Sequence, residues 1–226
     1  MLAPINKRGA RSGIKRISFI GVTIHNTGNT SKGANAISHA KYLQGTGSKT
    51  QASWHYCVDE NHITQSVPED EKAWHAKDGA YGKGNSNTVA IEICMNSDGG
   101  LLKATNKAVE LTANILKRNG ITTAYGYIFQ HNNWSGKNCP QMIRQGIPYD
   151  WNVFVSNVDA LLNEEEEDMV QRYSKVSELP KSLQREVQEL INSGALKGDE
   201  KGNLNITEDM ARCLIINKRY AEKLNK

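Results

Sequence analysis

Two histidines and one cysteine are spaced so that they could form a metal site. His25 closes the apolar run 20–25, and His131 follows a strand expected over 125–130. Cys139 precedes a proline, which would fix the backbone that presents the thiolate. Two imidazoles and a thiolate with a fourth position left open describe a catalytic zinc site. The spacing alone is also compatible with hydrogen-bonded structural histidines, the more common role of a lone histidine, so the surrounding elements must decide.

Glu92 is a further candidate for chemistry. It is the one carboxylate in residues 88–95, an apolar run with the composition of a central strand. Burying a carboxylate is unfavourable, so Glu92 requires either a partner or a function. The glycine-rich segment 70–87 comes just before this strand. Loops of that length without secondary structure of their own tend to be functional.

The elements that must position these residues alternate along the chain. Apolar side chains at helical spacing predict helices over residues 34–43, 105–119 and 151–163. Runs rich in β-branched or aromatic residues predict strands over residues 17–25, 53–58, 63–67, 88–95 and 125–130. This alternation indicates an α/β fold, in which functional side chains collect at strand ends. The polar and basic residues 1–16 are expected to dock on this domain as an arm.

An acidic run at residues 164–168 divides the chain. We predict a main domain over residues 1–163, a solvated acidic linker over 164–173 and a small helical C-terminal module over 174–226. In the module, one helix is expected to end at Gly194 and a second to be capped by Thr207. Chains below about 70–80 residues rarely form a stable core. The module is therefore expected either to form a homodimer or to dock on the main domain.

Charge is unevenly distributed along the 226 residues, whose formal net charge is +4. Residues 1–163 carry 17 Lys/Arg and 11 Asp/Glu, so the main domain is basic. This favours an acidic partner, either nucleic acid or the polyanionic bacterial wall. The basic residues form no stripe interleaved with aromatics, so we expect no nucleic-acid partner. No apolar run approaches the ~20 residues of a membrane span, and the basic N-terminus lacks the apolar segment of a secretory signal peptide.

Four cysteines are too few and too scattered for a disulfide scaffold. We predict that Cys57, Cys94 and Cys213 are small buried hydrophobes. Cys139 is then the one cysteine with a predicted chemical role.

Five stretches in a fixed order resemble the zinc-dependent N-acetylmuramoyl-L-alanine amidases of the type-2 amidase and peptidoglycan-recognition superfamily. The stretches are residues 22–27, 53–56, 74–79, 89–94 and 131–140. The resemblance covers about residues 8–162 and is greatest to phage endolysins. It implies a mixed central β-sheet flanked by helices, with the small helical module attached.

The same resemblance assigns roles in a catalytic site. The zinc ligands of the family match His25, His131 and Cys139. Glu92 matches the acid/base, and Lys137 matches a lysine of the site. Two alternatives stay open: Glu92 as a structural carboxylate paired with Lys137, and Lys137 as a residue that only forms salt bridges.

Four residues are implied in substrate binding, namely His75, Asp78, Gly79 and Trp54. Several relatives have a tyrosine where this chain has Trp54. An indole cannot transfer a proton as a phenol does, so Trp54 is expected only to shape the groove, which moves the acid/base role to Glu92. His75 is expected either to contact substrate or to bond its own loop.

The resemblance implies a Zn²⁺-dependent peptidoglycan hydrolase. Its substrate bond would be the amide between N-acetylmuramic acid and the L-alanine of the stem peptide. The alternative is a module that binds peptidoglycan without cutting it; such relatives usually lack the cysteine ligand, and Cys139 is present here. An endolysin would wait in the host cytoplasm and act on the cell wall after release, by a holin-type route. The C-terminal module could bind a wall polymer or dimerise.

Overall fold

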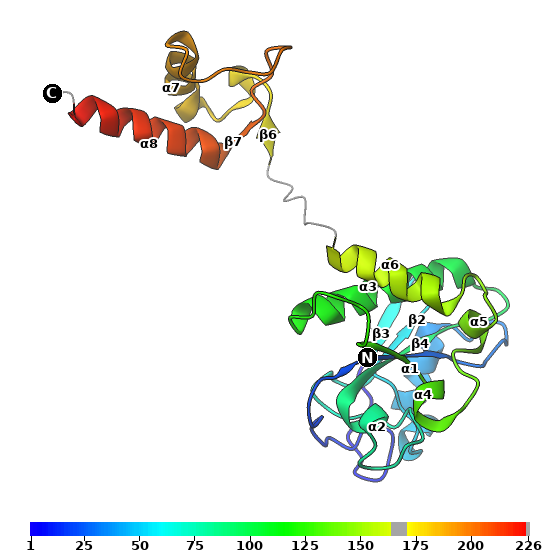
Figure 1. Cartoon of the computed structure of the whole chain (residues 1–226). Helices are drawn as coiled ribbons and strands as arrows, with labels where there is room; N and C mark the ends of the chain where they lie inside the picture. Colours follow the sequence, from blue (N-terminus) through cyan, green and yellow to red (C-terminus); the bar gives the residue numbers. More distant parts are fainter. Residues whose placement is uncertain (164–170, 225–226) are drawn as a thin grey trace. The chain divides into compact units, whose positions relative to one another are not determined.

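The computed structural model describes residues 1–163 and 171–224 and divides the chain into two compact units (Figure 1). The first unit spans Met1–Glu164 and the second spans Glu165–Lys226. No helix within the described residues has the length and apolar character that crossing a bilayer requires.

A five-stranded sheet in the order β3-β2-β4-β1-β5 forms the centre of the first unit. The strands are β1 (Gly21–Asn26), β2 (Tyr56–Val58), β3 (Ile63–Gln65), β4 (Thr88–Ile93) and β5 (Ile128–Gln130). β1 is parallel to both β4 and β5, and β2 is parallel to β4, whereas β3 is antiparallel to β2. The sheet is therefore mixed, and the parallel strands bring their C-terminal ends to one edge.

Side chains along these strands alternate between two different surroundings. Val22 and Ile24 of β1 lie in the main hydrophobic core, so His25 points to the opposite face of the sheet. β4 follows the same pattern, with Ile91 in the core and Glu92 on the other face. Because His25 and Glu92 are directly paired across the two strands, their side chains leave the sheet on the same side.

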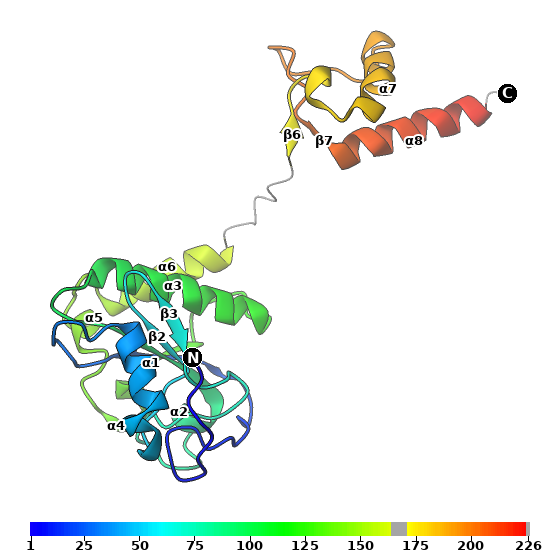
Figure 2. The same cartoon turned by 180° about the vertical axis from the view of Figure 1, so that it is seen from behind.

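Helices cover both faces of the sheet (Figures 1 and 2). On the core face, α3 (Leu101–Arg118) packs beside α6 (Trp151–Asn163), and Phe154 of α6 is fully buried between them and the strands. The remaining helical segments of this unit are α1 (Ala36–Gln44), η1 (Thr46–Lys49), α2 (Lys83–Asn87), α4 (Asn132–Ser135) and α5 (Gln141–Arg144). Ala36 of α1 packs against Cys57, which puts α1 on the face that carries His25.

The N-terminal arm docks on this unit, as its polarity predicted. The Arg11 guanidinium donates two hydrogen bonds to the Glu71 carboxylate, at 2.9 and 2.7 Å. Backbone hydrogen bonds from Ala3 to Ser66 and from Arg16 to Asp70 fix the two ends of the arm.

Most predicted elements are confirmed, but several differ in their bounds in the first unit. β1 begins at Gly21 and β5 at Ile128, each later than its predicted strand. The strand expected over 53–58 is shorter, because the chain pairs as β2 only from Tyr56. Helix α3 begins at Leu101 and not at Thr105, because the Thr105 hydroxyl donates to the Leu101 carbonyl inside the helix and does not cap it. The segment 70–87, predicted as a loop, ends in the short helix α2.

The second unit has a small core of its own. It contains β6 (Arg172–Tyr173), η2 (Val176–Glu178), α7 (Lys181–Asn192), β7 (Ile206–Thr207) and α8 (Glu208–Leu224). The Thr207 hydroxyl accepts a hydrogen bond from the Met210 amide, which confirms the predicted cap of the second helix. The module is not purely helical, because β6 and β7 pair antiparallel; strands of two residues are too short to leave a period in the sequence.

The C-terminal part differs from its prediction at an exposed cysteine. Cys213 is exposed on α8, so the prediction that it is a buried hydrophobe was wrong, whereas Cys57 and Cys94 are buried as predicted. Of the predicted acidic linker 164–173, residues 164–170 lie outside the described ranges, and Arg172 and Tyr173 form β6 and so belong to the second unit.

Candidate metal centre

His25, His131 and Cys139 come together on the face of the sheet that α3 and α6 do not cover. One ligand atom from each lies within 4.8 Å of the other two, and all three residues are buried. The topology explains the convergence, because His131 directly follows β5, which is parallel to β1. Its amide also bonds to the Ile24 carbonyl, beside His25. The imidazole rings of His25 and His131 lie edge-on with centroids 4.7 Å apart.

Cys139 reaches the two histidines through a turn held by backbone bonds. α4 ends at Gly136, whose φ of 71° lies in the left-handed region that glycine adopts without strain. The Asn132 amide then bonds to the Cys139 carbonyl at 3.0 Å, which closes the loop. The Cys139 Sγ consequently lies 3.8 Å from Nδ1 of His25.

The protonation of these side chains suits a bound cation. Burial lowers the pKa of His131 to about 4 and that of His25 well below 6.5, so both imidazoles are neutral at pH 7 and offer lone pairs. Burial raises the pKa of the Cys139 thiol to about 11, so a thiolate forms there only beside a positive charge. Both ring nitrogens of His131 are buried without a hydrogen-bond partner, which is unfavourable unless a ligand uses one. Two imidazoles and a thiolate fit Zn²⁺.

Glu92 faces this cluster from β4. Its Oε1 lies 3.8 Å from Nδ1 of His25, and its Oε2 has no hydrogen-bond partner. Burial raises the pKa of Glu92 to about 8, against the opposing effect of the Lys137 charge. A carboxylate with a pKa near neutrality can both accept and return a proton.

Lys137 is exposed on the loop that leads to Cys139. Its charge lowers the pKa of both Glu92 and His25, so it acts on the cluster electrostatically. Within the described residues, no ion pair joins Lys137 to Glu92, and Glu92 Oε1 instead lies 3.8 Å from the neutral His25. This favours a free carboxylate over the alternative of a structural pair.

His75 lies behind the cluster. Its side chain is buried, and Nδ1 lies 3.0 Å from Nε2 of His25 while Nε2 lies 3.5 Å from the Thr88 hydroxyl. The ring therefore faces protein atoms, while the His75 backbone amide bonds to Asn85 in the same loop. The expected bond within the loop is present, and contact with substrate stays a prediction.

Asp78 and Gly79 lie in the turn between His75 and α2. The Asp78 carboxylate accepts hydrogen bonds from the Gly84 and Asn85 amides, and the Gly79 carbonyl accepts one from the Asn85 side chain. These bonds give both residues a role in shaping the turn, and their contact with substrate stays a prediction.

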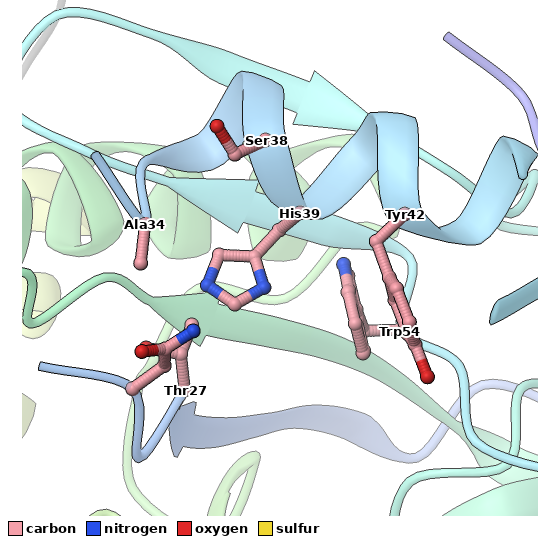
Figure 3. Close-up of a pocket in the computed structure, with 7 residues that line it drawn as sticks. Thr27, Ala34, Ser38, His39, Tyr42 and Trp54 are labelled. Atoms are coloured by element: carbon pink, nitrogen blue, oxygen red, sulfur yellow. The ribbon is translucent and has the colours of Figure 1, made fainter. Parts of the chain in front are cut away.

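Trp54 lines a separate open cavity of about 330 Å³ (Figure 3). The lining residues are Thr27, Asn29, Ala34, Ser38, His39, Tyr42 and Trp54. The indole of Trp54 lies edge-on to His39, with ring centroids 5.9 Å apart, and beside Tyr42. Thr27 links this cavity to the metal cluster, because it follows His25 by two residues at the end of β1.

Comparison with known proteins agrees with this geometry. Residues 16–142 match the N-acetylmuramoyl-L-alanine amidase family. The chain belongs to this family. It is 41% identical over 139 residues to the amidase CwlH of Bacillus subtilis, an alignment covering 62% of this chain and 52% of CwlH. It is 43% identical over 122 residues to the amidase XlyA of the same organism, covering 54% of this chain and 39% of XlyA.

The fold is shared as well. The solved catalytic domain of XlyA superposes with a TM-score of 0.57 at 33% identity, over 70% of this chain and 99% of that domain. This confirms the predicted fold of an amidase domain with a mixed sheet and flanking helices. The matched region spans about half of the length of CwlH and less of XlyA.

Three residues of this amidase domain were missed by reasoning from the sequence. Thr23, Thr88 and Trp134 form hydrogen bonds behind the cluster, at 2.8 Å between the two hydroxyls and 2.9 Å from the indole to Thr23. A signal was present, since Thr23 and Thr88 alternate with apolar residues and so share the face of His25 and Glu92.

Proposed function

We propose that this chain is a zinc-dependent N-acetylmuramoyl-L-alanine amidase of the endolysin type. It would hydrolyse the amide bond between the lactyl group of muramic acid and L-alanine in bacterial peptidoglycan. The observation that carries this proposal is the convergence of His25, His131 and Cys139 opposite Glu92. The similarity to CwlH and to the catalytic domain of XlyA supports it.

His25, His131 and Cys139 would hold the zinc ion. When bound, zinc supplies Lewis acidity toward the scissile carbonyl and toward a water molecule. The three side chains would supply one negative charge, from the thiolate, and two neutral imidazole nitrogens.

Glu92 would move the protons. Its carboxylate accepts a proton from the attacking water and later donates it to the nitrogen of the leaving L-alanine. A pKa raised by burial suits both steps, because the group then changes protonation state near neutral pH. Among the described residues around the cluster, Glu92 is the one carboxylate within 4 Å of a ligand nitrogen.

Lys137 would stabilise the developing oxyanion with its fixed positive charge. Lys137 is exposed and forms no ion pair with Glu92 within the described residues, which supports a charge available to substrate. Trp54 would shape the groove and pack against substrate, while Asp78 and Gly79 would set its other wall. Tryptophan has no phenol, so the acid/base role rests on Glu92 alone.

Peptidoglycan would be the partner, reached after release of the protein from the host cytoplasm. The C-terminal unit would either bind a wall polymer or form a homodimer. Its small separate core supports a module that adds to the catalytic domain.

Digestion of purified cell walls tests the proposal. An amidase releases new L-alanine amino termini without new reducing sugar ends. Glu92→Gln is the matched inactive variant, and the exposed Glu110→Gln is the control that should keep full activity. Binding to walls with neither product would instead identify a non-catalytic binding module, and new reducing ends would identify a glycosidase.

A further inference from the structure

We propose that His75 is a positioning residue that fixes the tautomer and orientation of the zinc ligand His25. This inference rests on the proposed zinc site and adds to it a residue that touches neither metal nor substrate. Ligand histidines commonly donate their second ring N–H to a carboxylate or carbonyl, which orients the ring. Here a second histidine occupies that place.

The contact between the two rings is close and buried. Nε2 of His25 and Nδ1 of His75 are 3.0 Å apart, and the rings meet edge-on at 87° with centroids 5.1 Å apart. His25 is 1% exposed and His75 is 8% exposed, so water does not compete for this bond. The backbone amide of His75 bonds to the Asn85 side-chain oxygen at 2.8 Å, which holds the loop in place.

A chain of hydroxyl groups determines which ring atom donates. The Thr88 hydroxyl donates its single proton to the Gly84 carbonyl at 2.7 Å, so its oxygen is an acceptor in its other contacts. Thr23, whose oxygen also accepts from the Trp134 indole, is therefore the donor to Thr88. For the same reason, Nε2 of His75 is the donor in its 3.5 Å contact with Thr88.

The remaining assignments follow from this one. With its proton on Nε2, neutral His75 has a lone pair on Nδ1 and accepts from Nε2–H of His25. His25 then has its own lone pair on Nδ1, the atom that lies 3.8 Å from Cys139 Sγ. The network thus presents His25 in the tautomer that can bind a metal together with Cys139.

The same network joins the two sequence segments that supply ligands. Trp134 lies between His131 and Cys139 in the chain, and its bond to Thr23 ties that loop to the strand of His25. If His75 only held its own loop, it would not be linked by hydrogen bonds to both the strand of His25 and the loop of Trp134. We therefore expect His75 to affect metal affinity more than folding.

Three substitutions of His75 test this. His75→Asn places an amide oxygen near the position of Nδ1 and keeps an acceptor for His25. His75→Gln places its polar group near Nε2, and His75→Leu fills the space without an acceptor. Zinc dissociation constants are measured by competition with a chromophoric chelator, and melting temperatures are measured on the metal-free proteins. His62→Gln, on the exposed hairpin histidine, is the control.

The expected result is a zinc affinity 10- to 100-fold weaker for the Leu and Gln variants, the usual effect of losing such a partner, and within about threefold of wild type for the Asn variant. Should His75→Leu fail to fold, the contrast between Asn and Gln still decides. Equal affinities in all three variants, whether unchanged or equally weakened, would overturn the inference. Absence of zinc binding by the wild type would instead refute the proposed function itself.

Discussion

Replacing Glu92 with glutamine should separate activity from stability. The substitution keeps the shape of the side chain and removes its charge and its ability to exchange protons. A positioned acid/base contributes about 10²–10⁴-fold to turnover, or ~3–5 kcal/mol of barrier, so wall hydrolysis should fall by that factor while zinc stays bound.

Glu92→Gln should lose activity but gain stability relative to wild type as pH rises in the metal-free protein. Burial raises the folded-state pKa of Glu92 from 4.5 to about 8, so the folded protein holds a proton that the unfolded chain releases above pH 4.5. Wild-type stability should therefore decline as pH rises from 4.5 toward 8. At ~1.4 kcal/mol per pH unit, this amounts to about 3 kcal/mol between pH 4.5 and 7. Glutamine does not titrate, so the stability of Glu92→Gln should not show this decline with pH.

The assay is chemical denaturation of both metal-free proteins at several pH values. The difference in free energy of unfolding, variant minus wild type, should rise by about 3 kcal/mol from pH 4.5 to 7. Any constant cost of burying the amide cancels in this comparison, and Glu110→Gln should show no such trend. A pH-independent difference, or a variant with full hydrolytic activity, would refute the role assigned to Glu92.

Three further predictions concern other parts of the chain. Lys137→Met should reduce turnover by about 10²–10³-fold with zinc content unchanged, measured by wall digestion and metal analysis; full turnover would exclude oxyanion stabilisation. His55 is buried, accepts from the Ala90 amide and bonds to the Glu71 carbonyl, and burial lowers its pKa to about 4. The neutral His55 ring therefore stabilises the fold above pH 6.5, and this stabilisation is lost as pH falls toward 4. In denaturation experiments on the metal-free proteins, the free energy of unfolding of His55→Gln should fall by about 3 kcal/mol less than that of wild type over this range. Parallel pH profiles of the two proteins would contradict this. A variant ending at residue 163 should keep its melting transition and its activity on soluble peptidoglycan fragments. Sedimentation with cell walls tests whether the C-terminal unit binds a wall polymer, and the mass in solution tests whether it forms a dimer. If the variant matches the full chain in both measurements, neither role holds.

The convergence of His25 and His131 could be predicted from the sequence because strand ends can be recognised there. His25 closes a β-branched run and His131 follows the strand predicted over 125–130, and parallel pairing of those strands brings their ends together. Glu92 stood out as a lone carboxylate in an apolar strand, although its exact pairing with His25 depends on a register that the sequence does not state.

The hydrogen-bond partner of His75 could not be predicted from the sequence. Its motif marks it as part of the site, but its partner His25 is 50 residues away, and only the folded chain shows which side of the cluster the ring occupies. Trp54 is similar, since its place in a cavity beside α1 follows from packing with His39 and Tyr42 and not from spacing. The short strands β6 and β7 were missed because two residues carry no period.

The metal content of the purified protein tests the central claim most directly. Elemental analysis should find one zinc per chain in the wild type and in Cys213→Ser, which alters an exposed cysteine far along the sequence from the site. Cys139→Ser and His131→Ala should lose the zinc while keeping a cooperative melting transition. A wild-type protein without zinc, or a Cys139→Ser variant that retains it fully, would contradict the assignment of His25, His131 and Cys139 as the metal centre.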